Sequence, residues 1–266
     1  MTRKAFSLSL FLFSILAFSF IFAIKFFAPY EMKQSAASLA SRYVPQLRSV
    51  LGQKPSAPLD AELHLAGFRL GQPALLRIFK QESELEIWLK RGERFELFKV
   101  YPICKWSGQL GPKLQEGDGQ APEGFYEVTR KQLNPNSRYH LAMNIGFPNA
   151  FDVSQAYTGS ALMIHGSCVS IGCYAMTDAG IEDIYEVVQQ ALSVSQISVP
   201  IHIFPFRMTE NNLRLNASSE WISYWNNLAE GDVLFLKTRL APEVWACGKR
   251  YHFEKAPENC ERVAGW

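Results

Sequence analysis

From residue 74 to residue 106, apolar and polar side chains nearly alternate along the chain. Three such runs, ALLRIFK (74–80), LEIWLK (85–90) and RFELFKVYPICKW (94–106), are separated only by short polar breaks. Alternation with a period of two is typical of β-strands that bury one face. Because connections of a few residues join antiparallel neighbours, the pattern predicts an antiparallel sheet.

Further strand-like runs follow a polar, glycine-rich stretch at 107–124, whose composition predicts loop or turn. The segment NPNSR at 134–138 has the composition of a connection between the first two of these runs. The runs are FYEVTRKQL (125–133), YHLAMNIGF (139–147), SALMIHG (160–166) and IHIFPF (201–206). Strands therefore account for most of the regular structure that the pattern predicts.

Two stretches repeat apolar residues at helical spacing. The first covers 179–193, and Thr177 or Asp178 before it supplies an N-cap. The second covers 217–229 and carries an aromatic stripe that predicts core packing. The repeating residues are Ile181, Ile184, Tyr185, Val188, Ala191 and Leu192 in the first helix, and Trp221, Tyr224, Trp225 and Leu228 in the second. The expected fold is mainly β with a few helices, in the α+β class.

The N-terminus carries an apolar run that is free of charge. Positions 5–24 follow Arg3 and Lys4 and would span roughly 30 Å as a helix, the thickness of a bilayer's hydrocarbon core. We expect an uncleaved membrane anchor; a cleaved signal peptide and a core helix are the alternatives. The positive-inside rule places Arg3 and Lys4 in the cytoplasm and the chain after Lys25 across the membrane.

This N-terminal run sets the expected domain boundaries and location. Residues 1–28 form the anchor or signal, 29–60 a linker, 61–240 the main domain and 241–266 a tail. The expected location is the periplasmic face of the inner membrane, or the periplasm if the segment is cleaved. A net charge of +2 and the lack of a Lys/Arg run argue against a nucleic-acid partner.

Five cysteines, at positions 104, 168, 173, 247 and 260, would then face a compartment in which disulfides form. Their odd number leaves at least one unpaired in a monomer. Cys247 and Cys260 lie close together in the tail and are the expected disulfide pair, with two unpaired thiols as the alternative. Cys104, inside a strand-like run, is expected to be a small core residue.

Residues 163–178, MIHGSCVSIGCYAMTD, gather most of the candidate chemistry. His165, Cys168 and Cys173 could hold a metal, but the paired ligand blocks typical of structural zinc sites are missing. A distant histidine such as His202 would have to complete the site. A Cys168–Cys173 disulfide and plain core packing are further alternatives. We expect no bound metal or cofactor.

A catalytic thiol is the remaining alternative, because a cysteine attacks well only when its proton is removed. Cys173 follows Gly172, which lets a substrate approach, and the backbone N–H groups of both residues are expected to hold an oxyanion. His165, at the end of the preceding strand, can return to the thiol, and Gly166 frees the chain after it. This arrangement suits acyl transfer.

The cluster resembles the signature of the YkuD-type L,D-transpeptidases, cysteine enzymes that act on peptidoglycan stem peptides. The segment QAPEGFYEV at 120–128 is similar to the family's upstream T-P-x-G-x-F segment, with Ala121 in place of threonine. The resemblance covers roughly residues 74–208. The residues that match the signature are His165, Gly166, Ser170, Gly172 and Cys173.

Departures from the common pattern point to one part of the family. Ile171 stands where a second histidine is usual, and Tyr174 and Ala175 follow the cysteine. With HIFPFRM at 202–208, these residues are similar to the YafK-like branch. That resemblance implies hydrolysis of the diaminopimelate–lysine link to an outer-membrane lipoprotein, or transfer of the acyl group to an amine, which gives a 3→3 crosslink or protein attachment. A catalytically inactive, membrane-tethered peptidoglycan-binding module is the alternative that Ile171 supports.

The resemblance also implies an L,D-transpeptidase-like β-sandwich or barrel core and a role for each matched residue. Cys173 is the expected nucleophile and His165 its general base. Backbone N–H groups at Gly172 and Cys173 are the expected oxyanion donors. Ser170 would orient the imidazole, bind substrate or stabilise the turn, and Gly166 supports the loop.

Stem peptides carry carboxylates, so cations are expected near the pocket. Arg207 is the first candidate, because a guanidinium binds a carboxylate through two hydrogen bonds. Lys105 and Lys113, which flank or enter the glycine-rich loop, are further candidates, and Tyr157 and Tyr174 could line the groove. The expected partners are peptidoglycan stems, a peptidoglycan-linked lipoprotein and the inner membrane.

Overall fold

The computed structural model describes residues 58–255 and 258–264, which fall in one compact unit running from Ala57 to the C-terminus. The predicted anchor at 5–24 and nearly all of the linker at 29–60 lie outside the described residues. Within those that are described, no helix combines the length and apolar character needed to span a membrane. The described residues on both sides of the expected boundary at residue 240 fall in the same compact unit.

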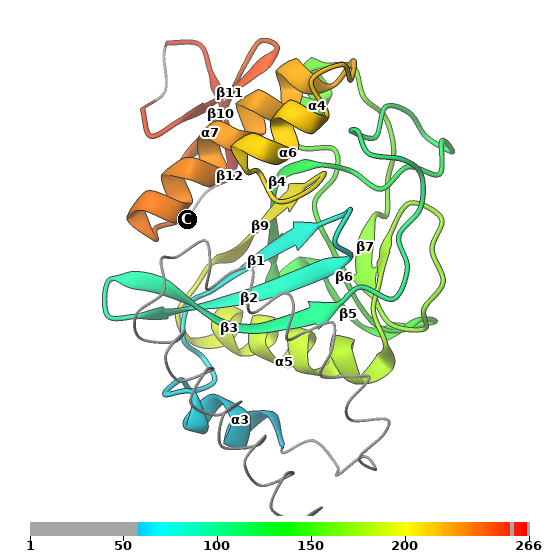
Figure 1. Cartoon of the computed structure of the whole chain (residues 1–266). Helices are drawn as coiled ribbons and strands as arrows, with labels where there is room; N and C mark the ends of the chain where they lie inside the picture. The colour runs from blue at the N-terminus through cyan, green and yellow to red at the C-terminus, as the bar shows by residue number, and fades with distance from the viewer. Residues whose placement is uncertain (1–57, 256–257, 265–266) are drawn as a thin grey trace, which may run out of the picture. The chain divides into compact units, whose positions relative to one another are not determined.

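The largest sheet has five strands (Figure 1). In spatial order they are β3 (Arg94–Pro102), β2 (Glu84–Arg91), β1 (Ala74–Phe79), β9 (Ser198–Phe204) and β4 (Gly124–Thr129). The predicted antiparallel pairing is confirmed for β1, β2 and β3. Strand β9 enters beside β1 in parallel, which places a strand from late in the chain inside the sheet, between β1 and β4.

Two smaller sheets complete the strands of the described residues. One has the order β5 (Leu133–Ser137), β6 (His140–Asn144), β7 (Met163–His165) and β8 (Tyr174–Ala175); the other has β11 (Arg250–Phe253), β10 (Val244–Cys247) and β12 (Glu261–Ala264). The segment NPNSR, expected as a connection, lies mostly within β5, and the 3-10 turn η1 (Arg130–Gln132) precedes it. The α+β class is confirmed, with three separate sheets whose strand orders do not close into a barrel.

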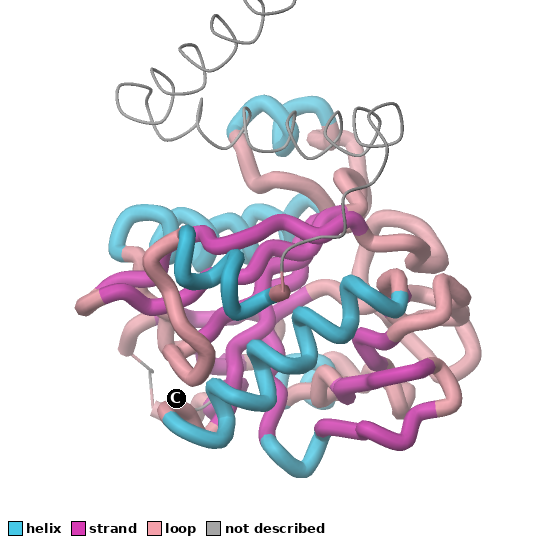
Figure 2. Tube along the Cα trace, turned by 90° about the horizontal axis from the view of Figure 1, so that it is seen from below, coloured by secondary structure: helices cyan, strands magenta, loops and turns pink. Residues whose placement is uncertain are grey.

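Two long helices cover opposite faces of the five-stranded sheet (Figures 1 and 2). Helix α5 (Asp178–Val194) shares a core cluster with Leu76 and Ile78 of β1, whereas Arg77, between them, reaches Asp232 of α7 (Ile222–Thr238). Strand β1 is buried on both faces as a result. Helix α5 also packs on β6 and β7, so it joins the large sheet to the sheet that carries the candidate site. The shorter helices are α3 (Leu59–Leu65), α4 (Ala150–Ser154) and α6 (Glu210–Leu215).

Helix α7 begins five residues later and ends nine residues later than the expected 217–229. Gly231 lies inside it, and a Cβ there would come within 2.5 Å of Phe253 and 2.6 Å of Phe125. Glycine disfavours helix in the absence of tertiary contacts. Here it is required because the tail and β4 pack directly against the helix. The aromatic stripe of α7 is confirmed as core packing.

Candidate active site

Strands β7 and β8 bring the two ends of the motif together. They pair in parallel, with Ile164 opposite Tyr174 and His165 opposite Ala175. Cys173 immediately precedes β8, and its thiol lies by the N–H of Met163, at the start of the strand that ends in His165. Residues 166–173 form the loop between the two strands.

The imidazole of His165 is buried, with an exposed fraction of 3%. Its Nδ1 lies 2.6 Å from the carbonyl oxygen of Gly166. Because a carbonyl only accepts, Nδ1 carries the proton in this bond, and Nε2 of the neutral ring keeps its lone pair. Burial lowers the pKa of His165, and the bond to Gly166 opposes this only in part. The ring of Tyr139 lies over the imidazole at 4.9 Å between centroids.

Cys173 is the free thiol of the described residues, and it is half-buried. Its Sγ lies 3.9 Å from the carbonyl oxygen of Ala161. Burial raises the pKa of the thiol, while the N–H of Met163 and the charge of Lys113 lower it to a smaller extent. Both shifts favour the neutral form at rest, for the thiol and for the imidazole. Such a pair passes its proton as the thiol attacks, without a preformed thiolate.

The remaining cysteines form two disulfides. Cys247 pairs with Cys260, which is the pair expected in the tail. Cys104 pairs with Cys168, with 5.2 Å between their Cα atoms. Cys104 is exposed and is therefore not the small core residue that was expected. Cys168 is neither a disulfide partner of Cys173 nor free to bind a metal.

The Cys104–Cys168 disulfide holds the loop between the two catalytic candidates. Ser167 and Cys168 have φ angles of 68° and 49°, a left-handed conformation that non-glycine residues rarely adopt. The N–H of Ser167 donates to Asp178 Oδ1 at 2.8 Å. A Cβ at Gly166 would lie 2.7 Å from that same oxygen. The motif glycine is therefore required so that the loop can turn tightly against the N-terminus of α5.

The turn that carries the nucleophile is held by two serines. Ser170 Oγ donates to the carbonyl oxygen of Cys173 at 2.7 Å, the turn-stabilising role among those expected. The N–H of Gly172, expected to be an oxyanion donor, instead donates to Ser107 Oγ at 2.5 Å. Of the two expected donors, the N–H of Cys173 is the one we retain. Nothing in the sequence singled out Ser107, which lies 65 residues from Gly172.

The expected role of Arg207 in binding a substrate carboxylate needs correction. Its guanidinium donates to Glu86 at 2.7 Å and to Glu84 at 2.5 Å, and it lies over the ring of Phe79. These two protein carboxylates raise the pKa of Arg207 against the effect of burial. Tyr174, considered for the groove, is buried and donates to the carbonyl of Pro122 at 2.6 Å. Both side chains serve the packing of the domain.

Three further residues were predicted to contact substrate. Lys105 is exposed, and its N–H and carbonyl pair with Ala175, two residues from the nucleophile. Lys113 is 4% exposed and donates to Asp118 at 2.5 Å. Tyr157 is half-buried and packs on two clusters of buried hydrophobic residues, one that includes α5 and one that includes α7. For each of these three residues, contact with the substrate stays a prediction.

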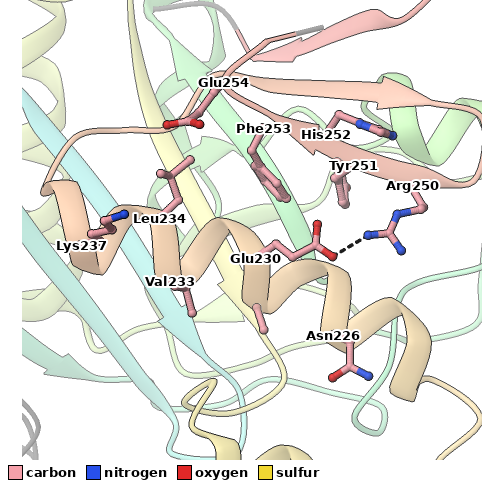
Figure 3. Close-up of a pocket in the computed structure, with 11 residues that line it drawn as sticks. Asn226, Glu230, Val233, Leu234, Lys237, Arg250, Tyr251, His252, Phe253 and Glu254 are labelled. Carbon is pink, nitrogen blue, oxygen red and sulfur yellow. Dashed lines mark hydrogen bonds and ion pairs between the residues drawn. The ribbon is translucent and has the colours of Figure 1, made fainter. Parts of the chain in front are cut away.

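A hollow of about 650 Å³ lies between α7 and β11 (Figure 3). Glu230 and Arg250 form an ion pair at 2.5 Å across it, and Val233 and Phe253 line its apolar side. None of the predicted site residues lines this hollow. It lacks the thiol and imidazole of the motif, and so we do not assign the chemistry to it. Among the described residues, no group of three or more His, Cys, Asp or Glu is placed to hold a metal ion.

Comparison with known proteins agrees with the motif. The YkuD model, which describes the L,D-transpeptidase catalytic domain, matches residues 80–203. The Escherichia coli (strain K12) protein named "Putative L,D-transpeptidase YafK" is 44% identical over 227 residues, which cover 84% of this chain and 92% of that protein. The helical cell shape determining protein Pgp2 from Campylobacter jejuni is 21% identical, with a TM-score of 0.42, over 67% of this chain and 68% of that one. L,D-transpeptidase 1 from Mycobacterium tuberculosis is 14% identical, with a TM-score of 0.29, over 51% and 64%.

Proposed function

Since the chain belongs to the YkuD family of L,D-transpeptidase catalytic domains, we propose that it is an extracytoplasmic cysteine enzyme that acts by acyl transfer on peptidoglycan stem peptides. The observation that carries this proposal is the pairing of β7 with β8, which brings the turn of Cys173 next to the strand that ends in His165. The thiol is free while the other four cysteines are oxidised. Two disulfides fit a chain that works in an oxidising compartment.

In the proposed reaction, Cys173 Sγ attacks the carbonyl carbon at the L-centre of diaminopimelate. Nε2 of His165 takes the thiol proton during the attack, because Nδ1 is already committed to Gly166. The N–H of Cys173 stabilises the negative oxygen of the tetrahedral intermediate. The imidazolium then returns its proton to the leaving amine, and a thioester remains on the enzyme.

The acyl acceptor decides the product. Water gives hydrolysis, and with a lipoprotein lysine as the leaving amine the result is release of the lipoprotein from peptidoglycan. An amine on another stem gives a 3→3 crosslink, and the amine of a protein lysine gives attachment. The similarity to the YafK protein supports an L,D-transpeptidase-type reaction, and we favour hydrolysis at the diaminopimelate–lysine bond on the residues that resemble that branch.

The inactive-module alternative rested on Ile171, which replaces a histidine of the common pattern. Its side chain is 87% exposed, on the loop and outside the buried pair. Replacing a histidine at such a position leaves the bond between His165 and Gly166 in place. The exposure of Ile171 therefore favours the enzyme over the silent module.

The test is turnover of purified muropeptides by the full chain, followed by mass spectrometry. Two substrates are needed: tetrapeptide stems, and stems that carry a lysine on diaminopimelate. Cys173→Ala should lower turnover by roughly a thousandfold or more, and His165→Ala by roughly a hundredfold or more. Ser154→Ala, which alters a serine on α4, serves as the matched control. Wild-type turnover that survives in Cys173→Ala would refute the proposal.

A further inference from the structure

The hydroxyl of Ser107 lies against the turn that carries the nucleophile. It accepts the N–H of Gly172 at 2.5 Å, donates to the carbonyl of Gly119 at 2.8 Å, and lies 3.3 Å from the Ser170 hydroxyl. Ser170 in turn donates to the carbonyl of Cys173 at 2.7 Å. The peptide groups on both sides of the Cys173 N–H are thus held by two serines.

We propose that Ser107 is a positioning residue for acyl transfer, which sets the direction of the Cys173 N–H toward the oxyanion. This inference rests on the proposed function. An oxyanion donor must lie about 2.7–3.1 Å from the position that the oxyanion will occupy. Gly172 has a φ of 102°, so its own backbone does not restrict the turn as a side chain would. An external acceptor at Ser107 supplies the missing restraint.

A substrate oxygen could instead displace Ser107 and take the N–H of Gly172. This exchange is disfavoured because hydrogen bonds fix the segment that carries Ser107 at both ends. Lys105, before it, exchanges two backbone hydrogen bonds with β8. After it, the fully buried ammonium of Lys80 donates to the carbonyls of Gln109 and Ala121 at 2.8 and 3.0 Å. The N–H of Ala121 also donates to the carbonyl of Ser107 at 3.0 Å.

Two reactions of Cys173, alkylation and acyl transfer, distinguish a loss of positioning from a general loss of the loop's structure. Alkylation by iodoacetamide needs the thiol and a base but develops no oxyanion. Acyl transfer needs the oxyanion donor as well. A residue that only orients the Cys173 N–H therefore affects muropeptide turnover and leaves alkylation nearly unchanged.

The experiment compares Ser107→Ala with Ser107→Thr in the full chain, with Ser154→Ala as a control. In Ser107→Ala we expect kcat for muropeptide turnover to fall about tenfold to a hundredfold with KM unchanged, while the alkylation rate of Cys173 stays within about twofold. Ser107→Thr keeps the hydroxyl and should retain most of kcat. Ser154→Ala should match the wild type in both assays.

Several results would overturn the inference. Equal kcat in Ser107→Ala and Ser107→Thr, whether normal or reduced, would show that the Ser107 hydroxyl does not contribute to turnover. Alkylation that falls as much as kcat in Ser107→Ala would mean that the loop has collapsed. A wild-type protein that alkylates at Cys173 but turns over no muropeptide would contradict the proposed function itself, which is a different outcome.

Discussion

His165 and Cys173 each rest in the neutral form, and the cause is the same for both. Burial lowers the pKa of the imidazole below its ordinary value of 6.5 and raises the pKa of the thiol above its ordinary value of 9.0. An ion pair would need the opposite shifts. The chain therefore differs from cysteine enzymes that store a thiolate, and the reaction depends on proton transfer at the moment of attack.

This charge state predicts a pH dependence. The rate of Cys173 alkylation should rise continuously from pH 6 through pH 9, because the thiolate fraction grows as the pH approaches a raised pKa. The acid limb of kcat/KM for turnover should lie below pH 6.5, where His165 gains its proton. Stopped-flow alkylation and steady-state rates across this range measure both. A plateau of alkylation below pH 7 would indicate a preformed thiolate instead.

Arg207 gives a second prediction for a single side chain. Arg207→Met should lower the free energy of unfolding by about 3 kcal/mol or more, because it removes the cation that the buried carboxylates of Glu84 and Glu86 share. The KM for stem peptides should not change. Chemical denaturation and steady-state kinetics test the two parts separately. A large rise in KM with unchanged stability would restore Arg207 as a substrate-binding residue.

The loop between β7 and β8 combines an unfavourable backbone conformation with a disulfide bond. The left-handed pair Ser167 and Cys168 is held by the disulfide from Cys104, and no property of the residues from 166 to 173 predicts that conformation. The second disulfide, Cys247–Cys260, joins β10 to the segment just before β12, in a sheet apart from the motif strands. The two disulfides therefore form a matched pair for testing what the loop requires.

Removing each disulfide should have different consequences. The double substitution Cys104→Ala with Cys168→Ala should cost about 4 kcal/mol of stability for a separation of 64 residues and lower turnover as well, since the loop loses its restraint. Cys247→Ala with Cys260→Ala should cost about 3 kcal/mol for a separation of 13 and leave turnover unchanged in folded protein. Thermal unfolding measures the two losses of stability, and assays below the melting temperature measure turnover. Equal turnover in both variants would mean that the loop needs no disulfide.

At this scale, the sequence predicts what is local and misses what is distant. The assignment of His165 and Cys173 as the catalytic pair rests on one short, contiguous motif and stays a prediction. Helix α5 was predicted closely, since its apolar spacing and the cap at Thr177 are local signals. Ser107 and the partner of Cys168 were missed because their contacts join residues more than 60 positions apart.

The tail is part of the folded domain, through a buried cluster that no local pattern indicates. Asp152 of α4 is buried and accepts the backbone N–H of Asn149, the N-cap residue of that helix. The side-chain amide of Asn149 donates to the hydroxyl of Tyr251 in the tail at 3.2 Å. Phe125 of β4 packs on the same tyrosine. The sequence analysis placed a boundary at residue 240, before the tail that carries Cys247 and Cys260. The packing shows that the three-stranded sheet, α4 and β4 share one core.

The cluster predicts how stability depends on pH. Burial raises the pKa of Asp152 from 3.8 to about 7. The folded state then holds a proton that the unfolded state releases, so the free energy of unfolding should fall as the pH rises from about 4 to 7, by up to about 1.4 kcal/mol per pH unit from this group. Asp152→Asn keeps an acceptor for the cap and should lose this slope. Urea denaturation of both proteins at pH 5 and pH 7 tests it. Identical slopes in the two proteins would contradict the assignment.

The central claim is that a thioester forms on Cys173 with His165 as its base. The most direct measurement is intact-protein mass spectrometry of the full chain mixed with diaminopimelate-containing stem peptide and quenched in acid, followed by peptide mapping. We predict an acyl adduct on Cys173 in the wild type, slower adduct formation in His165→Ala and none in Cys173→Ala. An adduct on another residue, or turnover in which Cys173→Ala equals the wild type, would contradict the account.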